Sequence, residues 1–251
     1  MTTSRPHCAA LNLSVIIPAF NEERLLGQTL REVQASLTPL AALGWATELI
    51  VCDNNSTDRT AQIAREAGAT VVFEPVNQIA RARNRGAAAA TGGWLLFIDA
   101  DSHPGPALMR DVAEAIQSGR YLAGGATIRF SEDHPVANFL TLFWNGLSRT
   151  RRLLAGSFIF CEATAFRKVG GFSQELFAGE ELDLTVRLKQ LGRETGRQIV
   201  ILHRHPLVTS ARKIKLYSSR ELVWFFLRAL FRQKATLTSR AACHPWYDGR
   251  R

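Results

Sequence analysis

The stretch Leu95-Leu96-Phe97-Ile98-Asp99-Ala100-Asp101 decides the fold of this chain. Its apolar part is typical of a buried strand, and the strand stops at two carboxylates that stand two positions apart. Strand alternation predicts that Asp99 and Asp101 leave the strand on the same side and face one pocket. Oxygen ligands at a strand end suit Mg²⁺ or Mn²⁺, which commonly accompany a diphosphate. The alternative is a turn or helix cap, where Asp is also common.

Outward from this strand, β-branched runs alternate with segments of helical spacing. Strands and helices are predicted in turn at 13–18, 21–37, 48–53, 56–68, 70–73, 79–90 and 94–98. This order indicates an α/β fold with a Rossmann-like, mostly parallel sheet flanked by helices. Ligands bind such sheets beyond the carboxyl ends of the strands. Three predicted strand ends carry polar clusters, at 18–22, 53–56 and 99–101.

After residue 105 the alternation loosens. Further helices are predicted at 107–118, 136–154 and 180–191, and further strands at 121–130, 157–160 and 199–202. A basic amphipathic helix is predicted at 218–234. Because no internal repeat or low-complexity linker interrupts the chain, we predict a single domain over residues 1–251.

Composition and charge restrict the partners and the compartment. The chain of 251 residues carries a net charge of +9, which favours an anionic partner such as a nucleotide, a phosphate or an acidic lipid surface. Its four cysteines lack CxxC spacing, which fits a reducing compartment. A polar N-terminus and the lack of an 18-residue apolar run favour a cytoplasmic protein, with contact at the inner face of the cell membrane left open.

Several common nucleotide and hydrolase motifs are missing. The first predicted strand is not followed by GxGxxG, which argues against a nicotinamide enzyme. GxxxxGK[ST] and GxSxG are also missing from the sequence, which argues against a P-loop NTPase and an α/β-hydrolase.

Five segments in a fixed order resemble the motifs of family-2 glycosyltransferases. They are Val15–Glu22, Val51–Asp58, Ala82–Gly86, Phe97–Asp101, and Val169–Phe172 together with Glu180–Leu184. The similarity extends over residues 13–191. It implies the GT-A fold and an inverting transfer of a hexose from a UDP- or GDP-linked sugar to a hydroxyl or a lipid phosphate, with Mg²⁺ or Mn²⁺ as cofactor.

The resemblance also implies where the donor and the metal bind. The family usually has two adjacent acids where this chain has Asp53-Asn54, and this difference leaves the base of the nucleotide open. Asp101 is expected to hold the metal. Apart from the resemblance, His203 and His205 follow a late predicted strand, and one of them, His203 first, is expected to complete the metal shell or to contact a phosphate. Two His at a strand end are also ordinary. The residues expected at the donor are Pro18, Ala19, Glu22, Asp53, Asn54, Arg83, Asp99 and Ala100.

The same resemblance points to the catalytic base. An inverting transfer to a hydroxyl needs a proton acceptor opposite the leaving group. The family commonly has a Glu-Asp pair before a helix, and this chain has Glu180-Glu181. Glu181 matches the base position, with Glu180 and Asp183 as the next candidates. Acids also favour a helix N-terminus for electrostatic reasons, so capping is the alternative. A phosphate acceptor would need no base.

The second half of the chain mixes aromatic and basic side chains, at 139–152 and 210–234. This mixture is typical of an interfacial helix and would suit polyprenyl phosphate or a lipid-linked glycan as acceptor. A helix packed on the core, with a solvated basic face, or a homodimer interface would use the same residues. We therefore expect a nucleotide-sugar half at 13–104, an acceptor half at 105–217 and a basic helix and tail at 218–251, with no nucleic acid as partner.

Two other functions each agree with part of the sequence. A sugar-1-phosphate nucleotidyltransferase would need a Gly-rich signature loop after the first strand, and residues 18–22 do not form one. A non-catalytic protein that binds anions or a lipid surface would explain the net charge of +9 but not the ordered acids at the strand ends.

Overall fold

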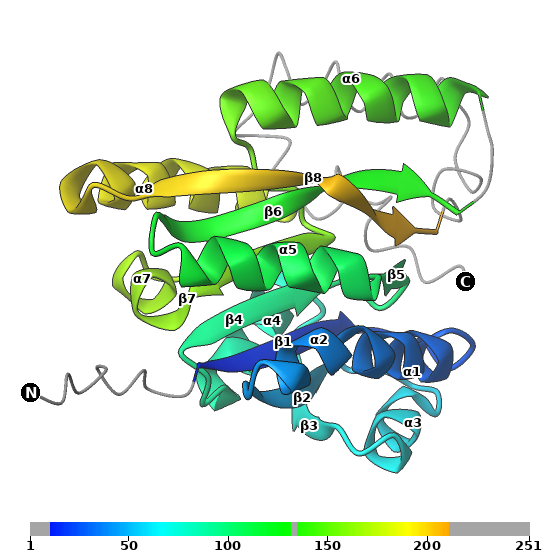
Figure 1. The fold of residues 1–251 in the computed structure, drawn as a ribbon. Coiled ribbons are helices and arrows are strands. Elements are labelled where there is room, and N and C mark those ends of the chain that lie inside the picture. The colour runs from blue at the N-terminus through cyan, green and yellow to red at the C-terminus, as the bar shows by residue number, and fades with distance from the viewer. Residues whose placement is uncertain (1–10, 132–134, 211–251) are drawn as a thin grey trace, which may run out of the picture.

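The computed structural model describes residues 11–131 and 135–210 (Figure 1). Its strands are β1 (Asn12–Ala19), β2 (Ala46–Asp53), β3 (Thr70–Phe73), β4 (Trp94–Ile98), β5 (Ser102–His103), β6 (Tyr121–Phe130), β7 (Phe158–Glu162) and β8 (Gln198–Thr209). Its helices are α1 (Leu26–Ser36), α2 (Thr38–Ala42), α3 (Thr60–Glu66), α4 (Ile79–Ala89), α5 (Pro106–Gln117), α6 (Pro135–Arg151), α7 (Ala163–Lys168) and α8 (Glu180–Thr195).

The strands form one mixed sheet in the order β3-β2-β1-β4-β7-β6-β8-β5. β1 pairs in parallel with β2 and β4, and β2 with β3, which confirms the predicted parallel first half. β7 runs antiparallel to both β4 and β6, while β8 runs parallel to β6. The expected α/β fold, with a mostly parallel sheet flanked by helices, is therefore confirmed.

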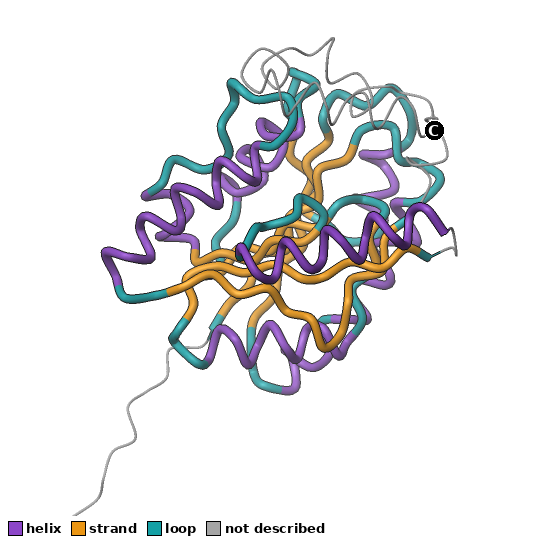
Figure 2. Tube along the Cα trace, turned by 90° about the horizontal axis from the view of Figure 1, so that it is seen from above, coloured by secondary structure: helices purple, strands orange, loops and turns teal. Residues whose placement is uncertain are grey.

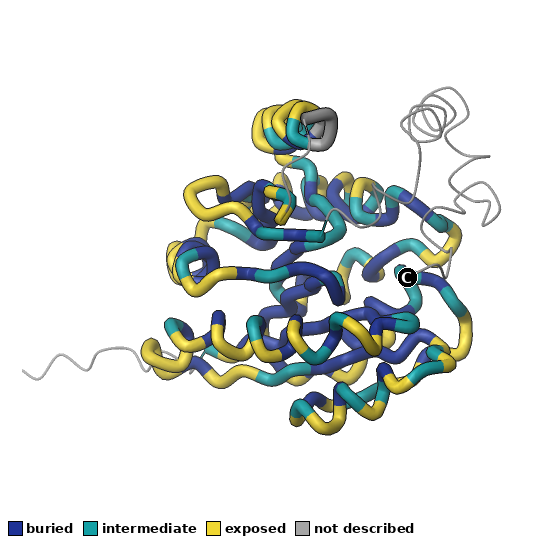
Figure 3. The backbone as a smooth tube through the Cα atoms, turned by 90° about the vertical axis from the view of Figure 1, so that its right-hand side faces the viewer, coloured by how far each residue is buried: buried dark blue, intermediate teal, exposed yellow. Residues whose placement is uncertain are grey.

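Helices cover both faces of the sheet (Figures 1 and 2). One core cluster joins α1, α2 and α5 to residues such as Val15 and Ile17 of β1. The other joins α4, α7 and α8 to the intervening Ile16 and to Phe97 of β4. Strand alternation thus divides the apolar side chains of the sheet between two cores. Helix α6 lies outermost and is largely exposed (Figure 3).

Two helices of the first half begin later than predicted. The segment before α1 is a turn in which Asn21 has φ 53°, and the Asn21 and Glu22 amides donate to the hydroxyls of Ser56 and Thr60. The segment before α3 is also a turn, because the Asp58 carboxylate accepts from the Thr60 amide at 2.9 Å. Polar side chains satisfy backbone groups in both turns, which the apolar spacing alone did not reveal.

The second half differs from the sequence-based expectation in extent. β8 continues to Thr209, well past the predicted end at residue 202, with an irregularity against β6 between Ala126 and Ile128. The short helices α2 and α7 were not predicted. The helix predicted at 218–234 lies outside the described residues. Within the described part of the chain, no helix is long and apolar enough to cross a membrane.

Close packing of α4 on β1 depends on a glycine. A Cβ built on Gly86 would lie 2.4 Å from Cγ2 of Ile16. Because Ile16 is fully buried and branched at Cβ, it has little freedom to move away. Gly86 therefore allows α4 to approach the sheet closely, and α4 carries the buried arginine of the site described below.

We predict that Gly86→Ala destabilises the protein although Ala favours helix. Overpacking costs about 1–3 kcal/mol, which outweighs the gain of about 1 kcal/mol from helix propensity. Gly146→Ala in α6 is the matched control, because a Cβ there meets nothing within 4 Å. Urea unfolding should show a loss for Gly86→Ala and a gain for Gly146→Ala; equal gains would contradict the packing argument.

Candidate active site

A buried arginine lies at the centre of the site. Arg83 of α4 is 1% exposed, and its guanidinium reaches acids from two distant segments. Nη1 donates to Oε1 of Glu180 at 2.8 Å, and Nη2 donates to Oδ1 of Asp99 at 3.0 Å. Nη2 also donates to the carbonyl of Gly156 at 2.8 Å. Arg83 thus joins the end of β4, the loop before β7 and the first turn of α8.

The two acids keep this buried cation charged. Burial by itself lowers the pKa of Arg83, but the charges of Asp99 and Glu180 outweigh it, so the pKa lies above its usual value. The guanidinium also lies 5.2 Å from the ring centroid of Phe172, within cation–π range. A Cβ on Gly156 would lie 3.0 Å from Nη2 of Arg83, so a larger side chain would crowd the guanidinium.

Glu181 lies beside this ion-pair cluster. It is the second residue of α8, whose N-cap residue Gly179 has φ 74°, and its side chain is partly buried. Burial and then the charge of Glu180 raise the pKa of Glu181 to about 8, and Arg83 opposes this effect. A carboxyl group with such a pKa exchanges its proton near neutral pH, which is the property of a general base.

Helix α4 also fixes the loop that leads to α8. The side-chain amide of Asn84 donates to the Phe172 carbonyl at 2.8 Å and accepts from the Phe172 amide at 2.9 Å. Nε2 of Gln78 donates to the carbonyls of Gln174 and Leu176. These bonds place the start of α8, and therefore Glu180 and Glu181, relative to Arg83.

The expected donor residues lie at the carboxyl ends of β1 and β2. Pro18 and Ala19 pair with Cys52 and Asp53 in register, so the two strand ends are neighbours. The buried Asp53 accepts from the Ser56 amide at 3.0 Å through Oδ1. Glu22 follows β1 and is buried as well. The sequence-predicted cluster of polar groups at this sheet edge is therefore assembled.

The side chains of Asn54 and Arg83, two of the expected donor residues, form hydrogen bonds to the protein. The Asn54 amide donates to the carbonyls of Glu74 and Val76 and accepts from the Gln78 amide, so it organises the loop after β3. Nη1 and Nη2 of Arg83 donate to protein oxygens, whereas its buried Nε has no hydrogen-bond partner among the described residues. These contacts hold both side chains in place.

The two acids after β4 are not arranged by strand alternation. β4 ends at Ile98, and residues 99–101 form a turn in which the Ser102 amide donates to the Asp99 carbonyl. Asp99 pairs with Arg83, and the Ala100 carbonyl accepts from the Thr29 hydroxyl at 2.7 Å. Asp101 is buried, and its carbonyl accepts from the Ser210 amide. The strand-based reason for a shared face of the acids was wrong.

His203 is not brought to Asp101. It lines a cavity between α6 and β8, and its neighbour in the sheet is the middle of β6 rather than β4. Residues close to Asp101 come instead from the far end of β8, where Thr209 pairs with Ser102. Asp183, the third base candidate, forms an ion pair with Arg187 four residues later, which stabilises the first turns of α8.

Some residues of the site were not predicted. Asn84 stands inside the quoted segment 82–86 but received no role, although an Asn between two arginines on an otherwise Ala-rich helix was a usable signal. Gly156 contributes a backbone carbonyl, and no sequence pattern could have identified it.

Parts of this chain are similar in sequence to a known family and to individual proteins. The family described as "Glycosyl transferase family 2" matches residues 14–172. Protein RfbJ of Shigella flexneri is 39% identical over 67 residues, which are 27% of this chain and 46% of that protein. Glycosyltransferase AglE of Haloferax volcanii is 28% identical over 192 residues, which are 72% of this chain and 62% of that protein. The chain thus spans less than two thirds of these relatives.

Solved structures share the fold at low identity. A mannosyltransferase from Pyrobaculum calidifontis, in complex with GDP-Man and Mn²⁺, has a TM-score of 0.68 at 18% identity and covers 96% of this chain and 68% of its own. Glucosyl-3-phosphoglycerate synthase from Mycobacterium tuberculosis, in complex with Mg²⁺ and uridine diphosphate, has a TM-score of 0.60 at 21% identity and covers 93% and 79%.

We predict that Arg83→Met lowers the free energy of unfolding by about 3–5 kcal/mol, because it leaves two acids in a buried site without their cation. Arg81→Met on the same helix is the matched control. The Arg81 side chain is 35% exposed and pairs with Glu74, so solvent screens the pair and the loss should be at most about 1 kcal/mol. Urea unfolding compares the two, and equal effects would contradict the role given to Arg83.

Proposed function

The chain belongs to glycosyl transferase family 2, and on this premise we propose that it transfers a hexose, with inversion, from a nucleoside diphosphate sugar to an acceptor hydroxyl or lipid phosphate. In this proposal residues 13–104 bind the donor and residues 105–217 contribute the acceptor side. The observation that carries it is the junction at Arg83, which holds an acid from each of these two regions within 3.0 Å of one guanidinium.

Glu181 is the proposed proton acceptor. When the acceptor is a hydroxyl, its oxygen forms the new bond to the anomeric carbon, and its proton passes to the Glu181 carboxylate. The bond between that carbon and the phosphate oxygen breaks, and the nucleoside diphosphate leaves with the electron pair. Glu180 raises the proton affinity of Glu181, while Arg83 prevents the cluster from accumulating uncompensated negative charge.

Asp101 is the proposed ligand of a divalent cation. Within residues 11–131 and 135–210, no group of three or more His, Cys, Asp or Glu side chains is arranged to hold a metal. A buried carboxylate at a strand end nevertheless fits Mg²⁺ or Mn²⁺, which typically use one or two carboxylates together with substrate phosphates. A bound cation would neutralise the charge of the departing diphosphate.

The similar structures and the surface of α6 support a proposal for the donor and the acceptor. The similar structures contain GDP-Man in one case and uridine diphosphate in another, so we propose a UDP- or GDP-linked donor. On the acceptor side, Phe139, Leu142 and Phe143 of α6 are each at least 67% exposed. Large apolar side chains on an outermost helix suit a polyprenyl-phosphate or other lipid-linked acceptor, presented at a membrane surface.

We predict that Glu181→Gln abolishes transfer to a hydroxyl acceptor but keeps donor affinity, because the amide cannot accept the proton. In the unaltered protein, kcat/KM should rise with pH as one proton is lost, and level off above about pH 8, because the raised pKa keeps Glu181 protonated below that value. Steady-state kinetics and donor titration measure both effects.

Asp183→Asn is the control for this experiment, since Asp183 is engaged by Arg187. It should retain turnover and the same pH profile. Retained turnover in Glu181→Gln would refute the assignment of the base, and a pH profile without a limb near 8 would contradict the role of its environment.

We predict that Asp101→Asn removes the metal dependence of donor binding. Titration calorimetry with UDP and with GDP, with and without Mn²⁺, should show one nucleotide whose affinity rises with Mn²⁺ in the unaltered protein and not in the variant. Asp58→Asn serves as control because the Asp58 carboxylate accepts hydrogen bonds from the Thr60 amide and hydroxyl in the turn before α3. Unchanged Mn²⁺-dependent binding in Asp101→Asn would overturn the assignment.

A further inference from the structure

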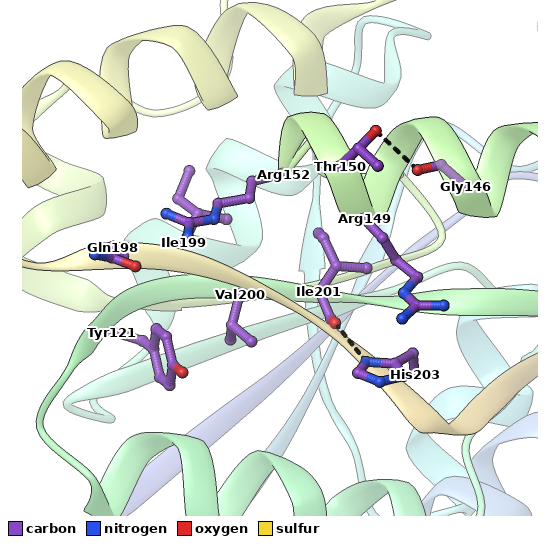
Figure 4. A pocket seen from close by; sticks show the side chains of 10 residues that line it. All are labelled: Tyr121, Gly146, Arg149, Thr150, Arg152, Gln198, Ile199, Val200, Ile201 and His203. Atoms are coloured by element: carbon purple, nitrogen blue, oxygen red, sulfur yellow. Dashed lines mark hydrogen bonds between the residues drawn. The ribbon is translucent and has the colours of Figure 1, made fainter.

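Two adjoining cavities lie under the C-terminal half of α6. Each has a volume of about 530 Å³, and they share Thr150, Arg152, Gln198 and Ile199. One extends over β6 and β8 toward His203 (Figure 4), and the other extends along the last turns of α8. We refer to the two together as the basic groove. Lys189, on its α8 side, lies nine residues after Glu180, about 13 Å along the helix.

The charged side chains that line the basic groove are all basic. None of the described residues that line either cavity is acidic. The cations of α6, its C-terminal end and α8 that line it are Arg149, Arg151, Arg152, Lys189 and Arg193. Across the described part of the chain, none of these five forms an ion pair, whereas Arg197 at the rim pairs with Glu162.

The acid nearest in sequence does not compensate this charge. Glu194 follows Arg193 directly but pairs with Lys168 of α7. The C-terminal ends of α6 and α8 contribute only about half a negative charge each. The five cations therefore exceed the charge of the two helix ends, and the residues that the structure describes give the groove a positive potential.

Two further observations agree with this excess. The pKa of Lys189 lies below its usual value, first because of partial burial and then because Arg152, Arg193 and Arg151 are near. Arg152 has φ 49°, in the left-handed region, directly after the last residue of α6. Glycine is the usual residue at such a position, so an arginine there is retained at a conformational cost.

We propose that the basic groove binds a phosphate-bearing anion, separately from the donor. Several arginines around a concave space match phosphate oxygens in charge and hydrogen-bonding geometry. The proposal goes beyond the proposed function and does not depend on it. The phosphate belongs either to the headgroup of an anionic membrane lipid or to a free phosphorylated compound.

The adjacent apolar surface distinguishes the two sources. Phe143 and Thr150 are seven residues apart on α6 and therefore share a face of the helix, and Thr150 lines both cavities. Phe143 is 67% exposed on the same outermost helix. A lipid headgroup in the groove would bring Phe143 to the membrane interface, whereas a free phosphate would not involve it.

The test uses the whole protein with two probes. These are inorganic pyrophosphate, followed by calorimetry, and vesicles of phosphatidylcholine with or without phosphatidylglycerol, followed by co-sedimentation. The variant Arg151→Gln/Arg152→Gln/Arg193→Gln should weaken binding of one of the two probes about a hundredfold. The matched control Arg31→Gln/Arg65→Gln/Arg110→Gln removes the same charge from exposed positions on α1, α3 and α5 and should weaken binding far less.

Two single variants sharpen the result. Arg152→Gly should weaken the same probe about fivefold while the Tm stays unchanged or rises, since glycine accepts a φ of 49° without strain. Phe143→Ala should weaken binding to vesicles only if the phosphate is a lipid headgroup. The proposal is overturned if neither probe binds, or if the groove and control triple variants lose affinity equally.

Discussion

One buried guanidinium holds the site together. Arg83 pairs with Asp99, 16 residues later, and with Glu180, 97 residues later. Removing charges from water is costly, and the pairing compensates only when every partner is in place. Helix α4 brings these partners together. Its Gly86 lets the helix lie close against β1, and its Asn84 forms two hydrogen bonds to the loop before α8. The junction therefore requires both halves of the chain to pack in one arrangement.

The same junction sets the electrostatics of the proposed chemistry. Glu180 and Glu181 are neighbours at the start of α8, and only Glu180 is directly bonded to Arg83. Glu181 takes the effect of burial and of the neighbouring negative charge, and its pKa rises. Two adjacent carboxylates thus receive separate roles: one fixes the geometry, and the other can accept a proton. The helix N-terminus alone would favour ionisation of both, so burial and charge repulsion outweigh it at Glu181.

The sequence predicted those parts of the molecule that follow from local pattern. Apolar runs located β1, β2, β3 and β4, and the polar residues after β1, β2 and β4 lie at one edge of the sheet because these strands are parallel. Features set by tertiary contacts were missed or misread. The resemblance placed Asn54 and Arg83 at the donor, and nothing in the sequence indicated that both side chains also bond to protein groups. His203 was linked to Asp101 because it follows a strand, but β8 extends to Thr209 and brings different residues to β5.

The most direct test of the account is the titration of Glu181 itself. Carbon-13 NMR of protein labelled at the glutamate side-chain carboxyls would follow this group, with its resonance identified by its loss in Glu181→Gln. We expect a midpoint near pH 8, because the cluster around Arg83 keeps the carboxyl partly buried beside Glu180. A midpoint in the ordinary glutamate range, about 4.3, would show that the environment does not prepare Glu181 as a base and would contradict the central claim.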